Sequence, residues 1–291
     1  MIYTRLIGGL GNQMFQYACG LAVAEKLGVD LNPDIIAFQK YSLRQYELGI
    51  FNISAKIDKR DHPGFYNDVI NRLGKQLNRL FFSEKKRIQQ NIFAEDRFTY
   101  DPRIFTVPDG TMLKGYWQSE KYFINIENKI RNEFLFKEKP DKKNKQQIKN
   151  ISNVESVSIH IRRGDYISDT QTNQVHGVCS LDYYKKAINY IAKKVTEPVF
   201  FIFSDEPEWA KTNLKLDFET VFISHNTGRK SYEDMRLMSQ CKHNIIANSS
   251  FSWWGAWLNQ NLDKIVIAPQ KWFNDTSRNT KDLIPESWIK L

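Results

Sequence analysis

The chain has few cysteines for its length: three among 291 residues, namely Cys19, Cys179 and Cys241. Their odd number and wide separation exclude a disulfide framework and the paired spacings that bind zinc. We therefore expect each thiol to be a small core residue, and we expect the protein to work in a reducing, cytoplasmic setting.

The chain also lacks the apolar segments that a membrane protein needs. No uninterrupted apolar run is long enough to span a bilayer, and no secretory signal precedes the first predicted strand. Any membrane contact is therefore expected to be peripheral, at the inner face of the membrane.

Acidic residues are outnumbered: 33 Asp and Glu stand against 42 Lys and Arg, which gives a net charge of +9. This charge suits a phosphate-rich ligand, an anionic membrane surface or nucleic acid. Much of the excess lies in the lysine-rich segment 137–150, which has little apolar content. We interpret it as a solvated linker, which predicts an N-terminal domain over 1–150 and a C-terminal domain over 151–291.

A glycine loop follows the first predicted strand. Gly8-Gly9-Leu10-Gly11 leads into a helical pattern that runs to Leu27, and Gly28 is a natural stop. Such a loop lets backbone N–H groups approach a phosphate or a sugar at a helix start, although it is equally typical of a tight turn that needs positive φ. Met14 stands where a dinucleotide motif has its third glycine, which counts against a nucleotide-dependent oxidoreductase.

Paired arginines follow a second apolar strand. Residues 157–161 predict a buried strand, and Arg162, Arg163, Gly164 and Asp165 come directly after it. The carboxyl edge of a parallel sheet is where open α/β folds bind ligands, and planar guanidinium groups hold phosphate oxygens in pairs. The two arginines therefore favour a diphosphate site, with an ion pair between Arg163 and Asp165 as the alternative.

A third segment, 244–258, predicts a short strand, a run of hydroxyl residues and an aromatic helix. Ser249, Ser250 and Ser252 could cap this helix or donate hydrogen bonds to phosphate oxygens, and Phe251 could stack on a base. We expect the tryptophans of this segment to fill the core.

The C-terminal half alternates between strands and helices, which predicts a doubly wound parallel sheet. Further strands are expected at 199–204, 219–224 and 264–268, and helices at 181–194, 208–214 and 232–241. The N-terminal half is less regular: 66–82 has helical spacing, and 112–122 changes from strand to helix.

Four segments together resemble the bacterial α1,2-fucosyltransferases, a family similar to glycosyltransferase family 11. They are Gly-Gly-Leu-Gly-Asn-Gln from residue 8, Gly-Tyr-Trp-Gln-Ser-Glu from 115, His-Ile-Arg-Arg-Gly-Asp from 160 and Asn-Ser-Ser-Phe-Ser-Trp-Trp from 248. The His-x-Arg-Arg-x-Asp element is also similar to that of α1,6-fucosyltransferases, and protein O-fucosyltransferases share a looser version of it. In order and spacing, the four segments cover nearly the whole chain.

The resemblance implies a fold and a reaction. The fold is α/β of the GT-B type, with two Rossmann-like domains facing across a cleft: domain 1–150 on the acceptor side, and domain 151–291 for GDP-fucose. The reaction is an inverting, metal-independent transfer of L-fucose to the 2-hydroxyl of a terminal galactose in a surface glycan or glycolipid. The chain lacks the Asp-x-Asp motif of metal-dependent glycosyltransferases, so we expect neither a metal nor a cofactor. Another fucosyl linkage remains an alternative, and a basic polyanion-binding protein is a further one.

Candidate site residues follow from these segments. We expect catalytic roles for Arg162, Asp165 and Asn12, with Arg162 on the diphosphate and the other two near the acceptor hydroxyl. Asp205 follows the 199–204 strand and could read the guanine edge, or else cap the helix near Pro207. The predicted donor-binding residues are Gly9, Gly11, His160, Arg163, Asp205, Ser249, Ser250, Phe251 and Ser252. The predicted acceptor-binding residues are Gln13, Tyr116, Trp117 and Gln118.

Overall fold

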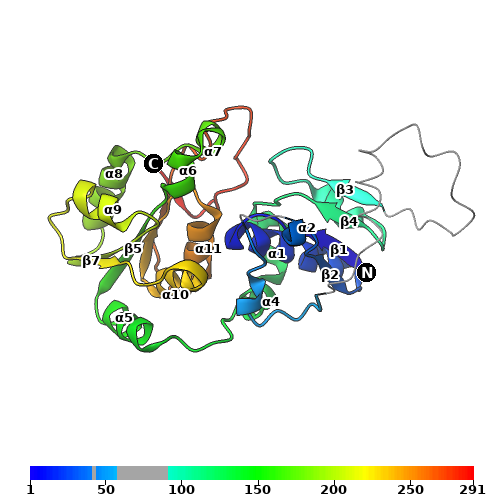
Figure 1. Ribbon diagram of the computed structural model, residues 1–291, viewed down its shortest axis with the longest axis horizontal. Coiled ribbons are helices and arrows are strands. Elements are labelled where there is room, and N and C mark those ends of the chain that lie inside the picture. The colour runs from blue at the N-terminus through cyan, green and yellow to red at the C-terminus, as the bar shows by residue number, and fades with distance from the viewer. Residues whose placement is uncertain (41–43, 58–90) are drawn as a thin grey trace, which may run out of the picture. The chain divides into compact units, whose positions relative to one another are not determined.

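A computed structural model of the protein describes residues 1–40, 44–57 and 91–291. The chain forms two units, Met1–Leu135 and Phe136–Leu291 (Figure 1). The helix expected over 66–82 lies outside the described residues.

The first unit is built on a parallel sheet with strand order β2-β1-β4-β3. Its strands are β1 (Ile2–Arg5), β2 (Leu31–Asp34), β3 (Ile92–Ala94) and β4 (Met112–Lys114). Its helices are α1 (Leu10–Leu27), α2 (Ala37–Lys40) and α4 (Glu127–Glu133), with 3-10 turns at Leu48–Ile50, Pro102–Thr106, Glu120–Tyr122 and Ile124–Ile126.

Helix α1 is the centre of this unit and is buried on all sides through most of its length. It ends as expected at Gly28, whose left-handed φ of 65° lets its N–H reach the carbonyls of Ala24 and Glu25. Near its start, Gln16 accepts a hydrogen bond from the N–H of Ile7 and donates one to the carbonyl of Gly115. One buried amide therefore ties the first strand to the loop after β4.

The second unit holds a six-stranded parallel sheet with order β10-β9-β8-β5-β6-β7. The strands are β5 (Glu155–Ile161), β6 (Pro198–Ser204), β7 (Thr220–Ile223), β8 (His243–Ile245), β9 (Val266–Ala268) and β10 (Ile289–Lys290). The helices are α5 (Lys142–Ser152), α6 (Gly164–Ser168), α7 (Thr170–His176), α8 (Leu181–Ala192), α9 (Pro207–Asn213), α10 (Tyr232–Gln240) and α11 (Ser250–Leu258), with a 3-10 turn at Gly228–Lys230.

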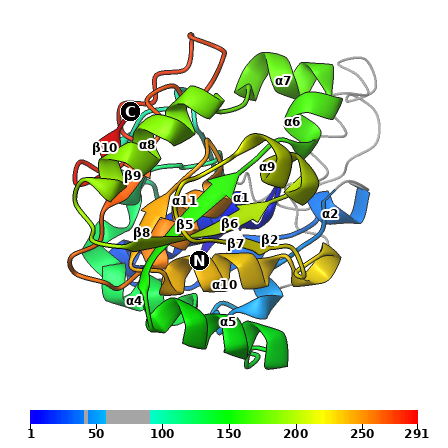
Figure 2. The ribbon, with the colours of Figure 1, turned by 90° about the vertical axis from the view of Figure 1, so that its left-hand side faces the viewer.

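This strand order is that of the Rossmann fold: the chain starts in the middle at β5, runs outward through β6 and β7, then restarts at β8 on the other side of β5. Helices cover both faces, with α8 on one side of β5 and α10 on the other (Figures 1 and 2). The α/β class and the doubly wound parallel sheet are therefore confirmed, and two parallel-sheet units are the parts of which a GT-B protein is made. Within the described ranges, no helix combines the length and the apolar character that crossing a membrane requires.

Strand β5 alternates between its two faces, although both are buried. Val157, Ile159 and Ile161 pack into the core cluster with α8 and α9. The intervening Ser158 lies on the opposite face, where its hydroxyl accepts a hydrogen bond of 2.8 Å from the Asn244 amide. Because successive side chains of a strand point to opposite faces, His160 shares the face of Ser158.

The lysine-rich segment is not a linker. Residues 142–152 form helix α5, which packs against α10 and β5 within the second unit. Asp141 caps the helix by accepting the N–H of Asn144, and the apolar contribution comes from buried Ile151. Lysine and glutamine are good helix formers, so two buried positions suffice to hold an otherwise polar helix. The division of the chain accordingly falls after Leu135 instead of at residue 150.

Candidate functional site

Two loops of the second unit meet where the strand order reverses, between β5 and β8. These neighbouring strands end at Ile161 and Ile245, and their chains then leave in opposite directions. A crevice forms at such a point in open α/β sheets and is where they bind ligands. The topology therefore brings the paired arginines after β5 to the same sheet edge as the hydroxyl run after β8.

Arg162 is held in place by two neighbours. Its Nη1 lies 3.0 Å from Oδ2 of Asp205, and its guanidinium carbon lies 5.5 Å from the centre of the Tyr166 ring. The other Asp205 oxygen accepts the backbone N–H of Arg163 at 3.0 Å. Because β6 pairs with β5 up to Ile161 and Ser204, Asp205 is the first side chain available to fix the arginine loop.

Asp205 therefore holds the loop after β5, and it does not cap the helix that follows. The N-cap position of α9 is Glu206. The guanine contact expected of Asp205 stays a prediction. Gly164 is required beside this carboxylate, because a Cβ there would come within 2.7 Å of Asp205 Oδ2.

Arg163 has different partners from Arg162. Its Nε lies 3.1 Å from Oε2 of Glu206, and its guanidinium lies 3.5 Å from the centre of the Trp209 ring. Only 16% of the side chain is exposed. Arg163 thus anchors the loop after β5 to Glu206, the N-cap residue of α9. No sequence motif points to this role of Glu206. Asp165 is the second residue of α6.

His160 is the second-last residue of β5, and its imidazole is neutral. Burial, with a smaller contribution from the charge of Arg162, lowers its pKa to about 3. Its ring lies 5.8 Å from that of Phe251 in α11, as its place on the Ser158 face requires. Within the described part of the chain its Nδ1 has no hydrogen-bond partner. A buried ring nitrogen without a partner is costly, and this cost falls at the edge where the arginine loop and α11 lie.

The hydroxyl run begins α11 but its serines differ in role. Ser249 occupies the N-cap position without a capping hydrogen bond from its side chain, and Ser250 is only partly buried. Ser252 is fully buried and donates to the backbone carbonyls of Ala247 and Ser249. The hydroxyl of Ser252 is thus used within the fold, and the donor contact predicted for this residue stays a prediction. The expected core role of Trp253 and Trp254 is confirmed, because both are completely buried.

The carboxyl edge of the first unit carries an amide pair beside charged groups, the Arg5–Asp34 ion pair and the carboxylate of Glu95. Asn12 Oδ1 accepts a hydrogen bond of 2.8 Å from Gln118 Nε2. The positive φ of the glycine loop belongs to Gly8 at 78°, whereas Gly9 is extended and caps α1, and Gly11 lies inside the helix. The glycine loop is thus a tight turn, and the side-chain amide of Asn12 lies directly beside Gly8.

Two of the predicted acceptor residues are structural. Gln13 is fully buried; it donates to the carbonyls of Gly8 and Gln45 and accepts from the N–H of Glu47. Trp117 is also fully buried, between the rings of Phe93 and Tyr122. The side chains of Gln13 and Trp117 are thus engaged within the first unit, and the acceptor contacts predicted for them stay predictions. Tyr116 and Gln118 remain partly exposed.

Glu95 is the main residue of this edge that sequence reasoning missed. It follows β3, and its carboxylate accepts the backbone N–H groups of Tyr116 and Trp117 at 2.8 and 3.1 Å. The available signal was weak, because β3 has only three residues and its neighbour β4 lies about twenty positions further along the chain.

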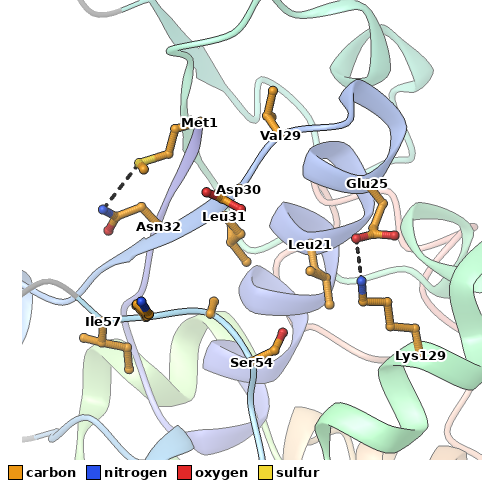
Figure 3. Close-up of a pocket in the computed structure, with 12 residues that line it drawn as sticks. Met1, Leu21, Glu25, Val29, Asp30, Leu31, Asn32, Ser54, Ile57 and Lys129 are labelled. Atoms are coloured by element: carbon orange, nitrogen blue, oxygen red, sulfur yellow. Dashed lines mark hydrogen bonds and ion pairs between the residues drawn. The ribbon is translucent and has the colours of Figure 1, made fainter.

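The first unit also has a cavity of about 640 Å³ beside the beginnings of β1 and β2 (Figure 3). Met1, Leu31 and Asn32 line it, together with an ion pair of 2.5 Å between Glu25 and Lys129. None of the predicted site residues lies here, because they cluster at the opposite, carboxyl edge of the sheet. In the described ranges, no group of three His, Cys, Asp or Glu side chains could hold a metal ion.

Comparison with known proteins shows the family of this chain. The model of glycosyl transferase family 11 matches residues 84–291. The chain is a member of glycosyl transferase family 11. It is 36% identical to an alpha-1,2-colitosyltransferase of Escherichia coli, over 100% of this chain and 99% of that protein. It is 34% identical to the O-antigen biosynthesis glycosyltransferase WbnK of Escherichia coli, over the full length of both.

More distant relatives of this family 11 member include the galactoside 2-alpha-L-fucosyltransferase Sec1 of Mus musculus. It is 24% identical over 100% of this chain and 74% of that protein. Among solved structures, the alpha-1,6-fucosyltransferase NodZ soaked with GDP-fucose matches 88% of this chain and 91% of its own, with 14% identity and a TM-score of 0.48.

Proposed function

We propose that this family 11 glycosyltransferase transfers L-fucose from GDP-fucose to the 2-hydroxyl of a terminal galactose, with inversion at the anomeric carbon. The observation that carries the proposal is the position of Arg162 directly after β5, at the sheet edge where the strand order reverses and the loop before α11 also emerges. Diphosphate is the leaving group of such a transfer, and a fixed guanidinium with helix N-terminal N–H groups stabilises its developing charge.

The roles of the individual groups follow from their chemistry. Arg162 binds the diphosphate, held by Asp205 in an orientation that costs no rearrangement during the reaction. Neutral His160 hydrogen-bonds the nucleotide without adding a second charge, and Ser249, Ser250 and Phe251 line the same edge. Because the arginine and the helix start supply the positive charge, we propose that the reaction needs no metal ion.

On the acceptor side, Asn12 orients the hydroxyl group, with Tyr116 and Gln118 beside it. An amide cannot take a proton, so the base is a carboxylate, and Asp165 remains our candidate. A direct displacement on the sugar by the acceptor hydroxyl inverts the anomeric centre, so a β-linked donor gives an α-linked product.

A colitosyl donor is the second candidate, favoured by the 36% identity to a colitosyltransferase. Colitose is L-fucose without its 3-hydroxyl. An enzyme that hydrogen-bonds the 3-hydroxyl rejects the deoxy sugar strongly, whereas one built for colitose tolerates fucose better.

The deciding experiment measures GDP release with GDP-fucose and with the GDP ester of colitose, against a panel of galactose-terminated acceptors. We expect GDP-fucose to give the higher kcat/KM, with an α-linkage to the galactose 2-hydroxyl by NMR. A higher kcat/KM for the colitose donor would replace the first candidate by the second. Titration with GDP, NADP and an oligonucleotide tests the enzyme class itself, because a polyanion binder would prefer the oligonucleotide.

We further propose that contact with the membrane is peripheral and uses the outer face of α5. Lys142, Lys145 and Lys149 recur at one-turn spacing on this face and are exposed. Clusters of lysines on a helix are attracted to anionic lipid headgroups. Sedimentation with phosphatidylglycerol vesicles should fall when all three become Gln, and it should be unaffected when exposed Lys185, Lys193 and Lys194 of the same unit do.

A further inference from the structure

The turn at residues 115–118 of the first unit adopts a conformation that its sequence disfavours. Trp117 has a φ of 55°, in the left-handed region that side chains other than glycine rarely occupy. This backbone state is strained, and more so for a bulky residue than for a small one. Something else in the fold must therefore hold the turn.

Glu95 is the group that holds it. Its two carboxylate oxygens accept the consecutive N–H groups of Tyr116 and Trp117, one oxygen for each. Hydrogen bonds to an ionised carboxylate are stronger than those between neutral groups. The approach is so close that residue 115 must be glycine: a Cβ there would meet the Glu95 Cβ at 2.5 Å and the Trp117 ring at 2.8 Å.

Packing and the backbone secure the turn on its other sides. The Trp117 indole is buried against Phe93 and Tyr122, and the Trp117 carbonyl accepts the N–H of Ser119 at 2.8 Å. Gln16 of α1 donates to the carbonyl of Gly115. Gln118, the residue that directly follows the left-handed position, directs its side chain to Asn12.

The orientation of Asn12 depends on that contact. Because Gln118 Nε2 donates to Asn12 Oδ1, the Nδ2 of Asn12 lies on the other side, over Gly8, where an added Cβ would come within 2.7 Å of it. A flip of the Asn12 amide would place two N–H donors against each other. The Gln118 contact thus helps to hold the Asn12 amide with its oxygen toward Gln118 and its Nδ2 toward Gly8.

We propose that Glu95 is the positioning residue of the acceptor side: by imposing the 115–118 turn it aims Gln118 at Asn12 and fixes the Asn12 amide for one orientation of an acceptor hydroxyl. This inference rests on the proposed function. Glu95 acts only through Gln118, so its removal should harm acceptor use and leave donor binding intact.

The test compares Glu95→Gln and Gln118→Ala with the double variant. Gln is isosteric with Glu but offers one carbonyl oxygen to two N–H groups, so the turn loosens without a cavity. Small misplacement of a catalytic group costs up to about 10²-fold in rate, and we expect each single variant to lower kcat/KM for the acceptor about ten- to a hundredfold. The double variant should be no worse than Gln118→Ala.

Three results would overturn the proposal. One is additive losses in the double variant, which would mean that Glu95 acts independently of Gln118. Another is a fall in GDP affinity of the same size, measured by titration. The third is an equal loss of acceptor kcat/KM in Asp96→Asn, the matched control that changes the neighbouring carboxylate, which is 76% exposed.

The proposal can be separated from the proposed function. If no galactose-terminated acceptor is used at all, the function fails, but the Asn12 and Gln118 side-chain amides can still be observed by ¹⁵N NMR. Glu95→Gln should shift both resonances and Asp96→Asn neither. Unchanged amide resonances in Glu95→Gln would refute the positioning role whatever the enzyme transfers.

Discussion

The two units present chemically different carboxyl edges. The edge of the second unit carries ion pairs, Arg162 with Asp205 and Arg163 with Glu206, beside the neutral imidazole of His160. The edge of the first unit presents the amide pair of Asn12 and Gln118, while its charged groups pair with each other, as Arg5 does with Asp34, or accept backbone N–H groups, as Glu95 does. Fixed charge suits a diphosphate, whereas an amide array suits uncharged hydroxyl groups. The difference supports the proposal that the second unit binds the donor and the first unit the acceptor.

Removing charge from the second edge should have the largest effect. We expect Arg162→Ala to lower the rate of transfer about 10²–10³-fold, because one positioned donor to a developing charge is lost. Arg162→Lys should recover little, since the planar fork is missing. Steady-state kinetics with Arg229→Ala as the matched surface control tests this, and near-normal turnover in a folded Arg162→Ala protein would remove Arg162 from the site.

Stability against pH should distinguish two buried groups of the second unit. The pKa of His160 is lowered to about 3, so between pH 4.5 and 6.5 its unfolded form binds one more proton, and its contribution to the free energy of unfolding rises with pH. Burial raises the pKa of Asp234 to about 7, so its contribution falls over the same interval.

Two variants separate these opposing contributions. Relative to wild type, Asp234→Asn should gain about 2 kcal/mol in free energy of unfolding as the pH rises from 4.5 to 6.5, and His160→Gln should lose about as much. Urea unfolding at the two pH values measures both differences. Differences of the same sign in the two variants would show that one of the two protonation states is misassigned.

Asp205 offers a smaller test of the donor edge. Since its two oxygens hold Arg162 and the backbone of Arg163, Asp205→Asn should weaken GDP binding about tenfold through the arginine loop. IDP, which lacks the guanine amino group, should lose affinity by the same factor. A loss confined to GDP would instead establish the guanine contact expected from the sequence.

The smallest expected effect is that of chelation. If arginine and helix N–H groups stabilise the leaving diphosphate, transfer in EDTA should stay within about twofold of the untreated rate. Activity that disappears in EDTA and returns with Mg²⁺ or Mn²⁺ would show that the residues of the second edge need a metal ion to stabilise the leaving diphosphate.

The second edge was largely predictable from the sequence, and the first was not. A buried strand followed by Arg-Arg predicts where the arginines lie, because the carboxyl ends of the strands of a parallel sheet meet at one edge. The helix expected over 232–241 is α10 at Tyr232–Gln240, and the strand over 199–204 is β6 at Pro198–Ser204.

What the sequence does not show is side-chain direction, whereas element type is largely readable. Gln13, Trp117 and Ser252 lie in the expected segments, but each points inward and satisfies backbone groups or fills the core. Glu95 acts across a sequence separation of about twenty residues through a backbone turn, and no local pattern shows such a contact. The lysine-rich sequence of α5 lacks the apolar periodicity of a packed helix, because only two of its positions are buried.

The distribution of tryptophan makes the two halves optically distinct. Of the seven tryptophans, only Trp117 belongs to the first unit. In the second unit Trp253, Trp254, Trp257 and Trp288 form one group, with ring centres 5.1 to 6.3 Å apart around α11. Indoles this close couple electronically and give a strong near-ultraviolet circular dichroism signal. That signal would follow the packing of α11, while the fluorescence difference between wild type and Trp117→Phe would follow the 115–118 turn.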